Sequence, residues 1–528
     1  MAAKILVSDD LSSEGVEILR KGGLEVDVKV GLPAEELRKI IGQYDGLAVR
    51  SATKVNAELL AAAEKLKVVG RAGVGIDNVD LPTATKRGVV VMNTPGGSAV
   101  TVAEQTFAMM LSMLRHVPAA TASVKAGKWE KKRFQGREAA GKTLGVIGIG
   151  NIGGIVVERA RAFGMEVVAY DPFSSAEAAS RIGATLVSLD DLWAKSDVIS
   201  LHVPLTEQTR HIVNAQTLAK MKRGAYLVNA ARGGVVDEMA LAEALKSGHL
   251  AGAALDVFEK EPPPADHPLF TLDNFVCAPH LGASTQEAQE IVAVQLAEQM
   301  VAFFAEGEIQ NAVNVPAVSK ELLASLGPWL DLASRVGALA GQLAPSHATK
   351  VTLEFAGDVT QHSTKPLTNE VLKGMLAFFT QDPVNVVNAQ ALAKERGLSI
   401  SEVKVAESPD YASTIGVKLE GASGSIEVVG SVLGKHDLRI VRVDRFEIDA
   451  VPDGHLIVLR NEDVPKIVGK VGTILGDAGV NIGRIHLSRA GMRGEAFSMI
   501  NIDSPASKQV LAELRAVPHV ISVTPIEL

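Results

Sequence analysis

Three polar side chains in the middle of the sequence have the types that the oxidation of an alcohol requires. Arg232, Glu261 and His280 each come at or shortly after the end of an apolar run typical of a β-strand. A histidine can accept a hydroxyl proton near neutral pH, and a carboxylate can orient its ring and stabilise its cation. An arginine can hold a carboxylate or a keto oxygen at two points. Taken singly, each residue also fits a solvated loop, whereas together they favour dehydrogenation of a secondary alcohol.

A glycine pattern points to a dinucleotide. The segment from Gly148 to Gly153 reads Gly-Ile-Gly-Asn-Ile-Gly, follows an apolar strand and opens a helical segment. In the G-x-G-x-x-G motif, Gly148 allows a tight turn, Gly150 lets the backbone approach the pyrophosphate, and Gly153 allows close packing of helix and strand. The helix N-terminus then supplies N–H groups to the phosphates. The alternative is a glycine-rich turn that binds nothing.

The acidic residue that completes the motif is Asp171, which ends the next strand about 20 residues further on. Its carboxylate would accept hydrogen bonds from the adenosine ribose and repel a 2′-phosphate, and residues 172–174 contain no compensating arginine. NAD(H) is therefore favoured over NADP(H). A second short pattern, Gly73-Val74-Gly75, lacks the third glycine and the acidic strand end, so we expect its N–H groups to bind an anion at most.

The elements that must position these residues form two alternating strand–helix units. The first spans residues 4–98, and the second starts at 142 and ends near 280, which predicts two parallel sheets covered by helices. The apolar run 98–117 predicts one long buried helix, and a capping box at 284–287 precedes another that runs to about Glu306.

The C-terminal part contains no catalytic motif. Residues 317–450 mix strand-like segments at 351–357, 425–433 and 438–444 with helical ones, and residues after 453 follow a β-α-β-β-α-β order. That order is the ferredoxin-like arrangement.

Composition excludes several classes of protein. The chain has 528 residues, 47% of them hydrophobic and 22% charged, which fits three or four globular domains. Its net charge of -8 argues against a nucleic-acid-binding protein. No apolar stretch is long enough for a membrane span, the N-terminus does not resemble a secretory signal, and we expect a cytoplasmic protein. The single cysteine, Cys277, is expected to be a buried thiol, and the histidines show no metal-ligand spacing, so no metal is expected.

Five segments together resemble the D-isomer-specific 2-hydroxyacid dehydrogenase family: 69–80, 146–154, 229–238, 253–263 and 278–285. The resemblance extends over the whole chain to the long branch of the family that oxidises D-3-phosphoglycerate. It implies an α/β fold of two Rossmann-like domains, an α+β intervening domain and a ferredoxin-like ACT domain. The implied domains are a substrate-binding domain of 1–98 and 282–312, an NAD-binding domain of 99–281, an intervening domain of 313–450 and an ACT domain of 451–528.

The resemblance also implies the roles of single residues. His280 would be the acid–base, Glu261 its partner, and Arg232 the ligand of the substrate carboxylate and carbonyl. NAD would contact Gly148, Gly150, Asn151, Ile152, Gly153, Asp171, Thr206, Ala230, Arg232, Asp256 and His280, with Asp256 near the carboxamide. The substrate would contact Arg50, Arg71, Val74, Gly75 and Lys131, where the two strand-end arginines Arg50 and Arg71 would hold its phosphate. Lys131 lies in a loop that reaches the neighbouring subunit in this family and is equally compatible with a solvated basic loop.

The ACT domain implies a small regulatory ligand, L-serine in many members of the family. Asn461, Asp463 and Asn481 stand where that domain places polar contacts, but the usual Pro-Gly is Pro465-Lys466 here. A serine-regulated domain and one used only for dimerisation both stay open, as do homodimer and homotetramer.

The resemblance therefore implies NAD-dependent oxidation of D-3-phosphoglycerate to 3-phosphohydroxypyruvate, the first step of serine synthesis. One alternative is another D-2-hydroxyacid dehydrogenase, including one that reduces 2-oxoglutarate. The other is a binding protein that senses NAD(H), as the related C-terminal-binding corepressors do.

Overall fold

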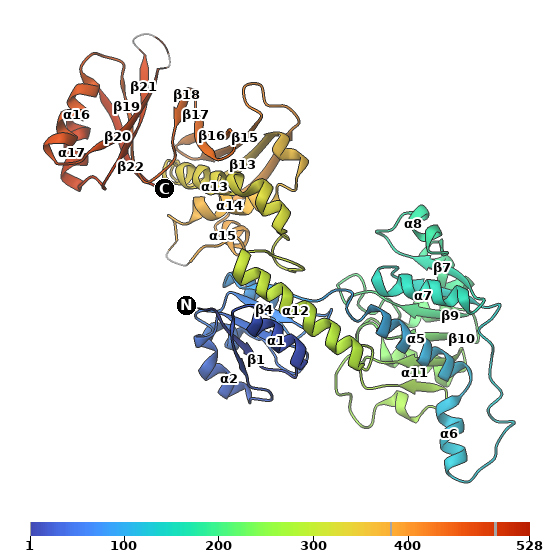
Figure 1. Ribbon diagram of the computed structural model, residues 1–528. Coiled ribbons are helices and arrows are strands. Elements are labelled where there is room, and N and C mark those ends of the chain that lie inside the picture. Colours follow the sequence, from blue (N-terminus) through green and yellow to red (C-terminus); the bar gives the residue numbers. More distant parts are fainter. Residues whose placement is uncertain (1, 381–382, 490, 492–493) are drawn as a thin grey trace.

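The structure is a computed structural model that describes residues 2–380, 383–489, 491 and 494–528 (Figure 1). Its first sheet has five parallel strands in the order β2-β1-β3-β4-β5. These strands are β1 (Lys4–Val7), β2 (Glu25–Val28), β3 (Gly46–Val49), β4 (Val68–Arg71) and β5 (Val90–Met92). Helix α12 (Gln286–Glu306) returns to this sheet from the far end of the next unit, and packs Val292, Leu296 and Met300 into its core.

The second sheet has seven parallel strands in the order β12-β11-β10-β9-β6-β7-β8. They are β6 (Thr143–Ile147), β7 (Glu166–Tyr170), β8 (Thr185–Leu186), β9 (Val198–Leu201), β10 (Ala225–Asn229), β11 (Leu250–Leu255) and β12 (Phe275–Cys277). Helices α5 (Ala99–Leu114) and α7 (Asn151–Ala162) bury one face, while α9 (Leu189–Lys195), α10 (Ala215–Lys220) and α11 (Glu238–Lys246) bury the other. The carboxyl ends of β6, β9, β10 and β11 therefore meet at one edge.

Three local expectations are wrong. The single helix expected over 98–117 ends at Leu114, because His116 takes a left-handed conformation with φ 54° before α6 (Val117–Lys125) begins. The N-cap of α12 is Thr285, whose side chain accepts the N–H of Ala288, rather than Ser284. Cys277 is exposed instead of buried, because β12 is the edge strand of its sheet.

The third sheet has six strands in the order β14-β13-β15-β16-β17-β18, mostly antiparallel. They are β13 (Ala348–Gly357), β14 (Ser399–Val405), β15 (Ser413–Gly421), β16 (Gly424–Leu433), β17 (Asp437–Val443) and β18 (Phe446–Ala450). Helices α13 (Lys320–Gln342) and α14 (Lys365–Leu376) pack on it and on each other. They approach so closely that a Cβ on Gly337 would overlap the carbonyl of Val371.

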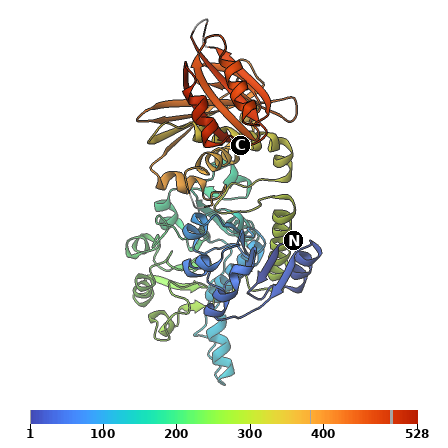
Figure 2. The same cartoon turned by 90° about the vertical axis from the view of Figure 1, so that its left-hand side faces the viewer.

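The last sheet has four antiparallel strands in the order β20-β21-β19-β22, the order of a ferredoxin-like domain. They are β19 (His455–Glu462), β20 (Ile482–Arg489), β21 (Glu495–Ile502) and β22 (Val520–Glu527). Helices α16 (Ile467–Asp477) and α17 (Lys508–Ala516) cover one face of this sheet. The third unit, which comprises the preceding sheet and its helices (320–450), covers part of the other face, where Phe446 stacks on Phe497. Figure 2 shows these two units together at one end, with α6 projecting from the opposite end.

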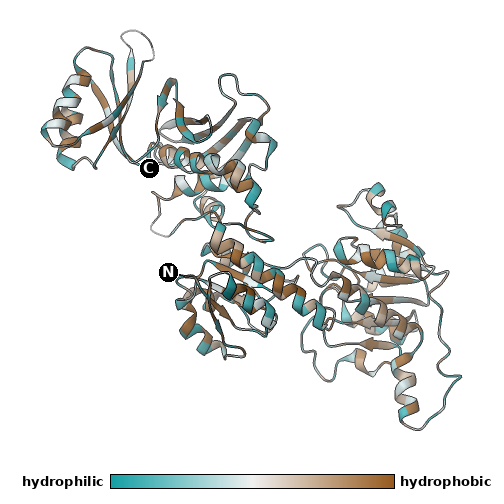
Figure 3. Ribbon diagram, in the orientation of Figure 1, coloured by the Kyte–Doolittle hydropathy of each residue, from teal (hydrophilic) through white to brown (hydrophobic). Residues whose placement is uncertain are grey.

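Apolar residues concentrate on the strands and on the inner helix faces, and polar residues on the outer surface (Figure 3). In the described part of the chain, no helix is both long enough and apolar enough to cross a membrane.

Candidate active site

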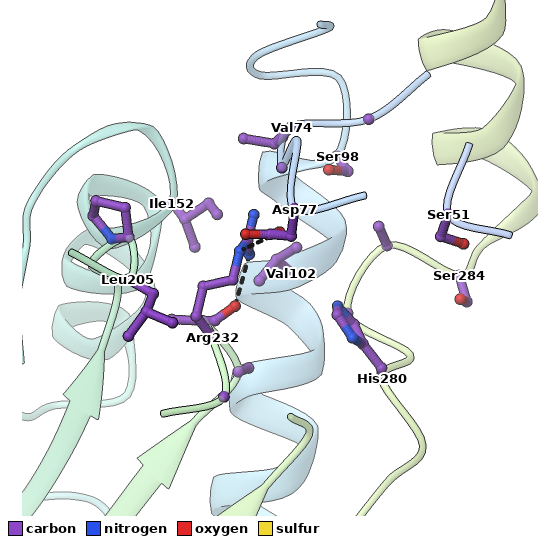
Figure 4. Close-up of a pocket in the computed structure, with 18 of the residues that line it drawn as sticks. Ser51, Val74, Asp77, Ser98, Val102, Ile152, Leu205, Arg232, His280 and Ser284 are labelled. Carbon is purple, nitrogen blue, oxygen red and sulfur yellow. Dashed lines mark hydrogen bonds and ion pairs between the residues drawn. The ribbon is translucent and has the colours of Figure 1, made fainter. Parts of the chain in front are cut away.

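A cleft of about 790 Å³ lies between the first two sheets and takes its walls from both. Most of the side chains selected from the sequence line it, and Figure 4 shows part of this wall. The predicted site residues that line the cleft are Arg50, Arg71, Val74, Gly75, Gly150, Asn151, Ile152, Ala230, Arg232, Glu261 and His280. The cleft thus joins the expected substrate and cofactor contacts in one space.

His280 and Glu261 form a hydrogen-bonded pair inside the cleft. The Nδ1 of His280 lies 2.8 Å from Oε2 of Glu261, and the other carboxylate oxygen accepts the N–H of Phe258 at 3.1 Å. The hydrogen bond to Glu261 raises the pKa of His280 against the opposing effect of burial. Burial pushes the pKa of Glu261 upward, but the bonds from His280 and Phe258 outweigh it and leave that pKa lowered. The pair therefore has an imidazole that can take up a proton and a carboxylate that stays charged.

Asp256 fixes the backbone of the loop that carries His280. Its side chain is fully buried, and its two oxygens accept the N–H groups of Leu281 and Gly282 at 2.8 and 2.7 Å. These bonds stabilise a loop in which His280 has a φ of 56°, a left-handed conformation that costs energy for a residue other than glycine. Asp256 lies outside the cleft wall, so its expected place beside the carboxamide stays a prediction. Burial raises the pKa of its carboxyl group.

Arg232 crosses the cleft from the second unit to the first. Its Nε lies 3.1 Å from Oδ2 of Asp77, and its Nη1 donates to the carbonyl of Ala231 at 2.7 Å (Figure 4). The remaining nitrogen, Nη2, lies over Gly75, where any Cβ would collide with it. The guanidinium is thus held against the Gly73–Gly75 loop with one nitrogen free for a ligand.

The Gly73–Gly75 loop is shaped to bind an anion. The N–H of Gly73 donates to Oγ1 of Thr94 at 2.8 Å, and Nδ2 of Asn93 donates to the carbonyl of Val74 at 2.5 Å. Across the ranges that the structure describes, the N–H groups of Val74 and Gly75 donate to no protein acceptor. Two free N–H groups beside a guanidinium suit a carboxylate.

Arg71 and Arg50 both line the cleft on the side of the first unit. The Nε of Arg71 is buried and has no hydrogen-bond partner in the described structure. Burial, followed by repulsion from Arg232, lowers the pKa of Arg71 to about 10. Arg50 donates to the carbonyl of Asp10 at 3.1 Å, and its own N–H is held by Asp9. An anionic ligand would satisfy the unpaired Nε and relieve the repulsion between the arginines.

The nucleotide end of the cleft fits a dinucleotide. Gly148 has a φ of 88°, space beside the Cα of Gly150 is open, and a Cβ on Gly153 would overlap the carbonyl of Gly148. Helix α7 begins directly after Gly150, so its first N–H groups face this space. Asp171 accepts the N–H groups of Ile149 and Phe173, both at 2.9 Å, which fixes its carboxylate at the end of β7. Gly148, Gly150, Gly153 and Asp171 thus meet the requirements of the motif.

Some predicted residues lie elsewhere. Thr206 is exposed next to the cleft residue Leu205 and bonds with Thr209. Lys131 is exposed in the loop after α6, away from the cleft.

In the fourth unit, Asn461 and Asp463 line a pocket of about 50 Å³, whereas Asn481 lies outside it and donates to Asp503 at 2.7 Å. Asn461 is buried, and its Oδ1 has no partner in the described structure. Lys466 has a φ of 78° at the N-cap of α16, so the backbone keeps a conformation that usually calls for glycine.

The structure adds cleft residues that the sequence did not single out. Lys54 lines the same cleft as Arg50 and Arg71, and its signal was a cation four positions after Arg50. Asp77 pairs with Arg232, and only its position two residues after Gly75 could have suggested it. His202 bonds through Nε2 to Ser200 at 2.8 Å, and burial lowers its pKa to about 4, so it stays neutral.

Comparison with known proteins agrees with this geometry. A family described as D-isomer specific 2-hydroxyacid dehydrogenase, NAD binding domain matches residues 107–282, a D-3-phosphoglycerate dehydrogenase intervening domain matches 325–444, and an ACT domain matches 455–519. The D-3-phosphoglycerate dehydrogenase of Archaeoglobus fulgidus is 42% identical over 527 residues, which cover 99% of this chain and 100% of the relative. The chain belongs to the D-3-phosphoglycerate dehydrogenase family.

Two further similarities support this assignment. The D-3-phosphoglycerate dehydrogenase of Bacillus subtilis is 40% identical over 530 residues, 99% of each chain. The crystal structure of a D-lactate dehydrogenase from Aquifex aeolicus, complexed with NAD and lactic acid, has a TM-score of 0.51 at 32% identity, covering 60% of this chain and all of that one. The expected α/β fold class is confirmed, as is the assignment as an NAD-dependent oxidoreductase.

Proposed function

We propose that the protein catalyses the NAD-dependent oxidation of D-3-phosphoglycerate to 3-phosphohydroxypyruvate, the entry to serine synthesis. The observation that carries this proposal is the single cleft that combines a nucleotide fingerprint, the His280–Glu261 pair and three cations, Arg50, Lys54 and Arg71. The family names of full-length relatives support the same substrate. Another 2-hydroxyacid would leave the cations at the Arg71 end without a phosphate to bind.

In the proposed reaction, Arg232 and the Val74–Gly75 amides hold the substrate carboxylate and the C2 oxygen. His280 accepts the C2 hydroxyl proton on its Nε2, because its Nδ1 is engaged by Glu261. Bound NAD+ supplies the acceptor for the hydride that leaves C2. Glu261 stabilises the imidazolium that forms, and in the reverse direction the same imidazolium returns the proton. Arg71, Arg50 and Lys54 hold the phosphate.

The test follows NADH oxidation with 3-phosphohydroxypyruvate, hydroxypyruvate, pyruvate and 2-oxoglutarate in parallel. We expect the phosphorylated acid to have the highest kcat/KM, and His280→Ala to lower kcat by about 10²- to 10⁴-fold. Equal kcat/KM values for all four acids would contradict a preference for the phosphorylated substrate. Unchanged turnover in His280→Ala would contradict the role of His280 in proton transfer. The absence of any turnover by the wild type would favour an NAD(H)-sensing protein.

We propose that the fourth unit binds L-serine. The unpartnered Oδ1 of Asn461 and the Asp463 carboxylate could both accept hydrogen bonds from an ammonium group. Titration of L-serine into the assay should inhibit the wild type and not Asn461→Ala. Full activity of the wild type at saturating serine would contradict this proposal and favour a domain that serves only in dimerisation.

We also propose a homo-oligomer, a dimer or a tetramer. Trp129 is 83% exposed in the loop beyond the projecting α6, and Val117 and Val124 on that helix are also exposed. A second copy of the chain would bury these side chains, and Lys131 would then lie at the neighbour's cleft. Light scattering of Trp129→Ser should show a smaller molar mass than that of the wild type. Equal masses would contradict the role of this surface in subunit contact. The cytoplasmic location stays a prediction.

A further inference from the structure

A buried carboxylate–imidazole pair lies next to the cleft and has no part in the proposed mechanism. Glu238 and His267 approach to 2.8 Å, and their side chains are only 9% and 8% exposed. Of the contacts between a carboxylate and a basic side chain in the described residues, no other has both side chains buried to this degree. Removing a carboxylate from water is costly unless its oxygens receive hydrogen bonds, so such a pair calls for a structural or functional reason.

Both oxygens of Glu238 are used. Oε2 is bonded to Nε2 of His267, and Oε1 accepts the N–H of Glu259 at 2.6 Å. The other ring nitrogen of His267, Nδ1, accepts the N–H of Leu269 at 3.4 Å. Since Nδ1 accepts, the ring proton sits on Nε2 and is donated to the carboxylate. The pair therefore fixes the backbone at Glu259 from inside the second unit.

The backbone at Glu259 leads directly to the catalytic carboxylate. Phe258, the residue before it, donates its N–H to Oε1 of Glu261, and the ring of Phe258 packs edge-on against His267 at 6.0 Å. The other oxygen of Glu261 is the one bonded to His280. A continuous set of contacts thus runs from Glu238 through residues 258 and 259 to the carboxylate that orients the histidine.

We propose that Glu238 and His267 are positioning residues, which hold the 258–261 loop so that Glu261 meets His280. This inference deepens the proposed function and rests on it, because it assigns the pair a task only if Glu261 and His280 move the proton. Glu238 itself never touches the substrate or the cofactor; it acts through the loop.

The test uses Glu238→Ala in the full-length enzyme and the pH profile of NADH-dependent reduction. His280 is faced by Glu261 and Asp256, which raise its pKa, and by Arg232, which lowers it. If the loop loosens, only the contribution of Glu261 is lost, so the pKa of His280 falls. Reduction requires the imidazolium, and we therefore expect the alkaline limb of kcat to move to lower pH. We also expect kcat to fall by about 10- to 100-fold, while the Kd of NADH measured by fluorescence stays unchanged.

Leu241→Ala is the matched control, because Leu241 is fully buried on the same helix, α11, and in the same core as Phe258, but its side chain makes no hydrogen bond to the 258–261 loop. It should lower the melting temperature without moving the alkaline limb. Glu238→Gln keeps an oxygen for the Glu259 N–H and should recover part of the loss. His267→Gln still offers an N–H to Glu238 and should behave likewise.

An alkaline limb that stays in place in Glu238→Ala overturns the inference, even if the protein is less stable. If Glu238→Ala does not fold, His267→Phe decides, because it keeps a ring against Phe258 but removes the N–H donated to Glu238, and an unmoved limb in that variant overturns the inference. Failure of the proposed function would be seen separately, as a wild type that does not reduce 3-phosphohydroxypyruvate or a His280→Ala variant that reduces it normally.

Discussion

Arg71 provides the sharpest test of the phosphate end of the cleft, because a bound anion would offset the cost of burying its guanidinium. Its Nε is buried without a partner, and burial together with Arg232 lowers its pKa to about 10. A hydrogen bond between charged groups contributes about 1.5–3 kcal/mol. At about 1.4 kcal/mol for each factor of ten, Arg71→Met should lower the kcat/KM for 3-phosphohydroxypyruvate by about 10- to 150-fold.

The assay compares 3-phosphohydroxypyruvate with hydroxypyruvate, which differs only by the phosphate, at saturating NADH. If Arg71 binds the phosphate, the loss is confined to the phosphorylated acid, and the ratio of the two kcat/KM values falls by the same factor. Arg71→Lys should recover little, since an ammonium group cannot reproduce the two-point geometry of a guanidinium. Arg38→Met, at an exposed ion pair of the same unit, should leave both values unchanged. An equal loss for both acids would refute the reasoning and place Arg71 at the carboxylate.

Three further outcomes are expected. In Glu261→Gln the main cause of the raised pKa of His280 is lost, so that pKa falls and the alkaline limb of reduction moves to lower pH; a limb that stays in place would contradict the pairing. Asp171→Ser removes the carboxylate at the ribose, and fluorescence titration should show weaker NADH binding by about 1.5–3 kcal/mol with a smaller preference over NADPH. Gly337→Ala inserts a methyl group between α13 and α14, and calorimetry should show destabilisation by about 1–3 kcal/mol with normal turnover.

The features that were predictable from the sequence depend on local patterns. The motif from Gly148 to Gly153 requires one backbone geometry, and the alternation of strands and helices places strand ends at one edge, so Arg232, Glu261 and His280 could be assigned to one site. The break at His116 was missed, although Pro118 at the start of α6 gave a signal for it. Strand β14 was also missed, because it is a largely exposed edge strand without an apolar pattern.

The contacts between sequence-distant side chains could not be predicted in this way. Asp77 meets Arg232, and Glu238 meets His267, only because the two sheets and their loops are packed as they are. Only its position two residues after Gly75 distinguishes Asp77 from the other exposed aspartates of the chain, and that spacing does not name its partner. These two contacts are therefore properties of the tertiary structure, whereas the motifs are properties of the sequence.

The charge of the cleft shows why the overall balance of -8 says little about this substrate. Arg50, Lys54, Arg71 and Arg232 all line the cleft, and Asp77 is already engaged by Arg232. A substrate with a phosphate at one end and a carboxylate at the other can bridge these cations, whereas a hydroxyacid without a phosphate would leave the Arg71 end unpaired. Arg232 of the second unit already reaches the Gly73–Gly75 loop of the first, so a substrate with two anionic groups would bind to cations of both units at once.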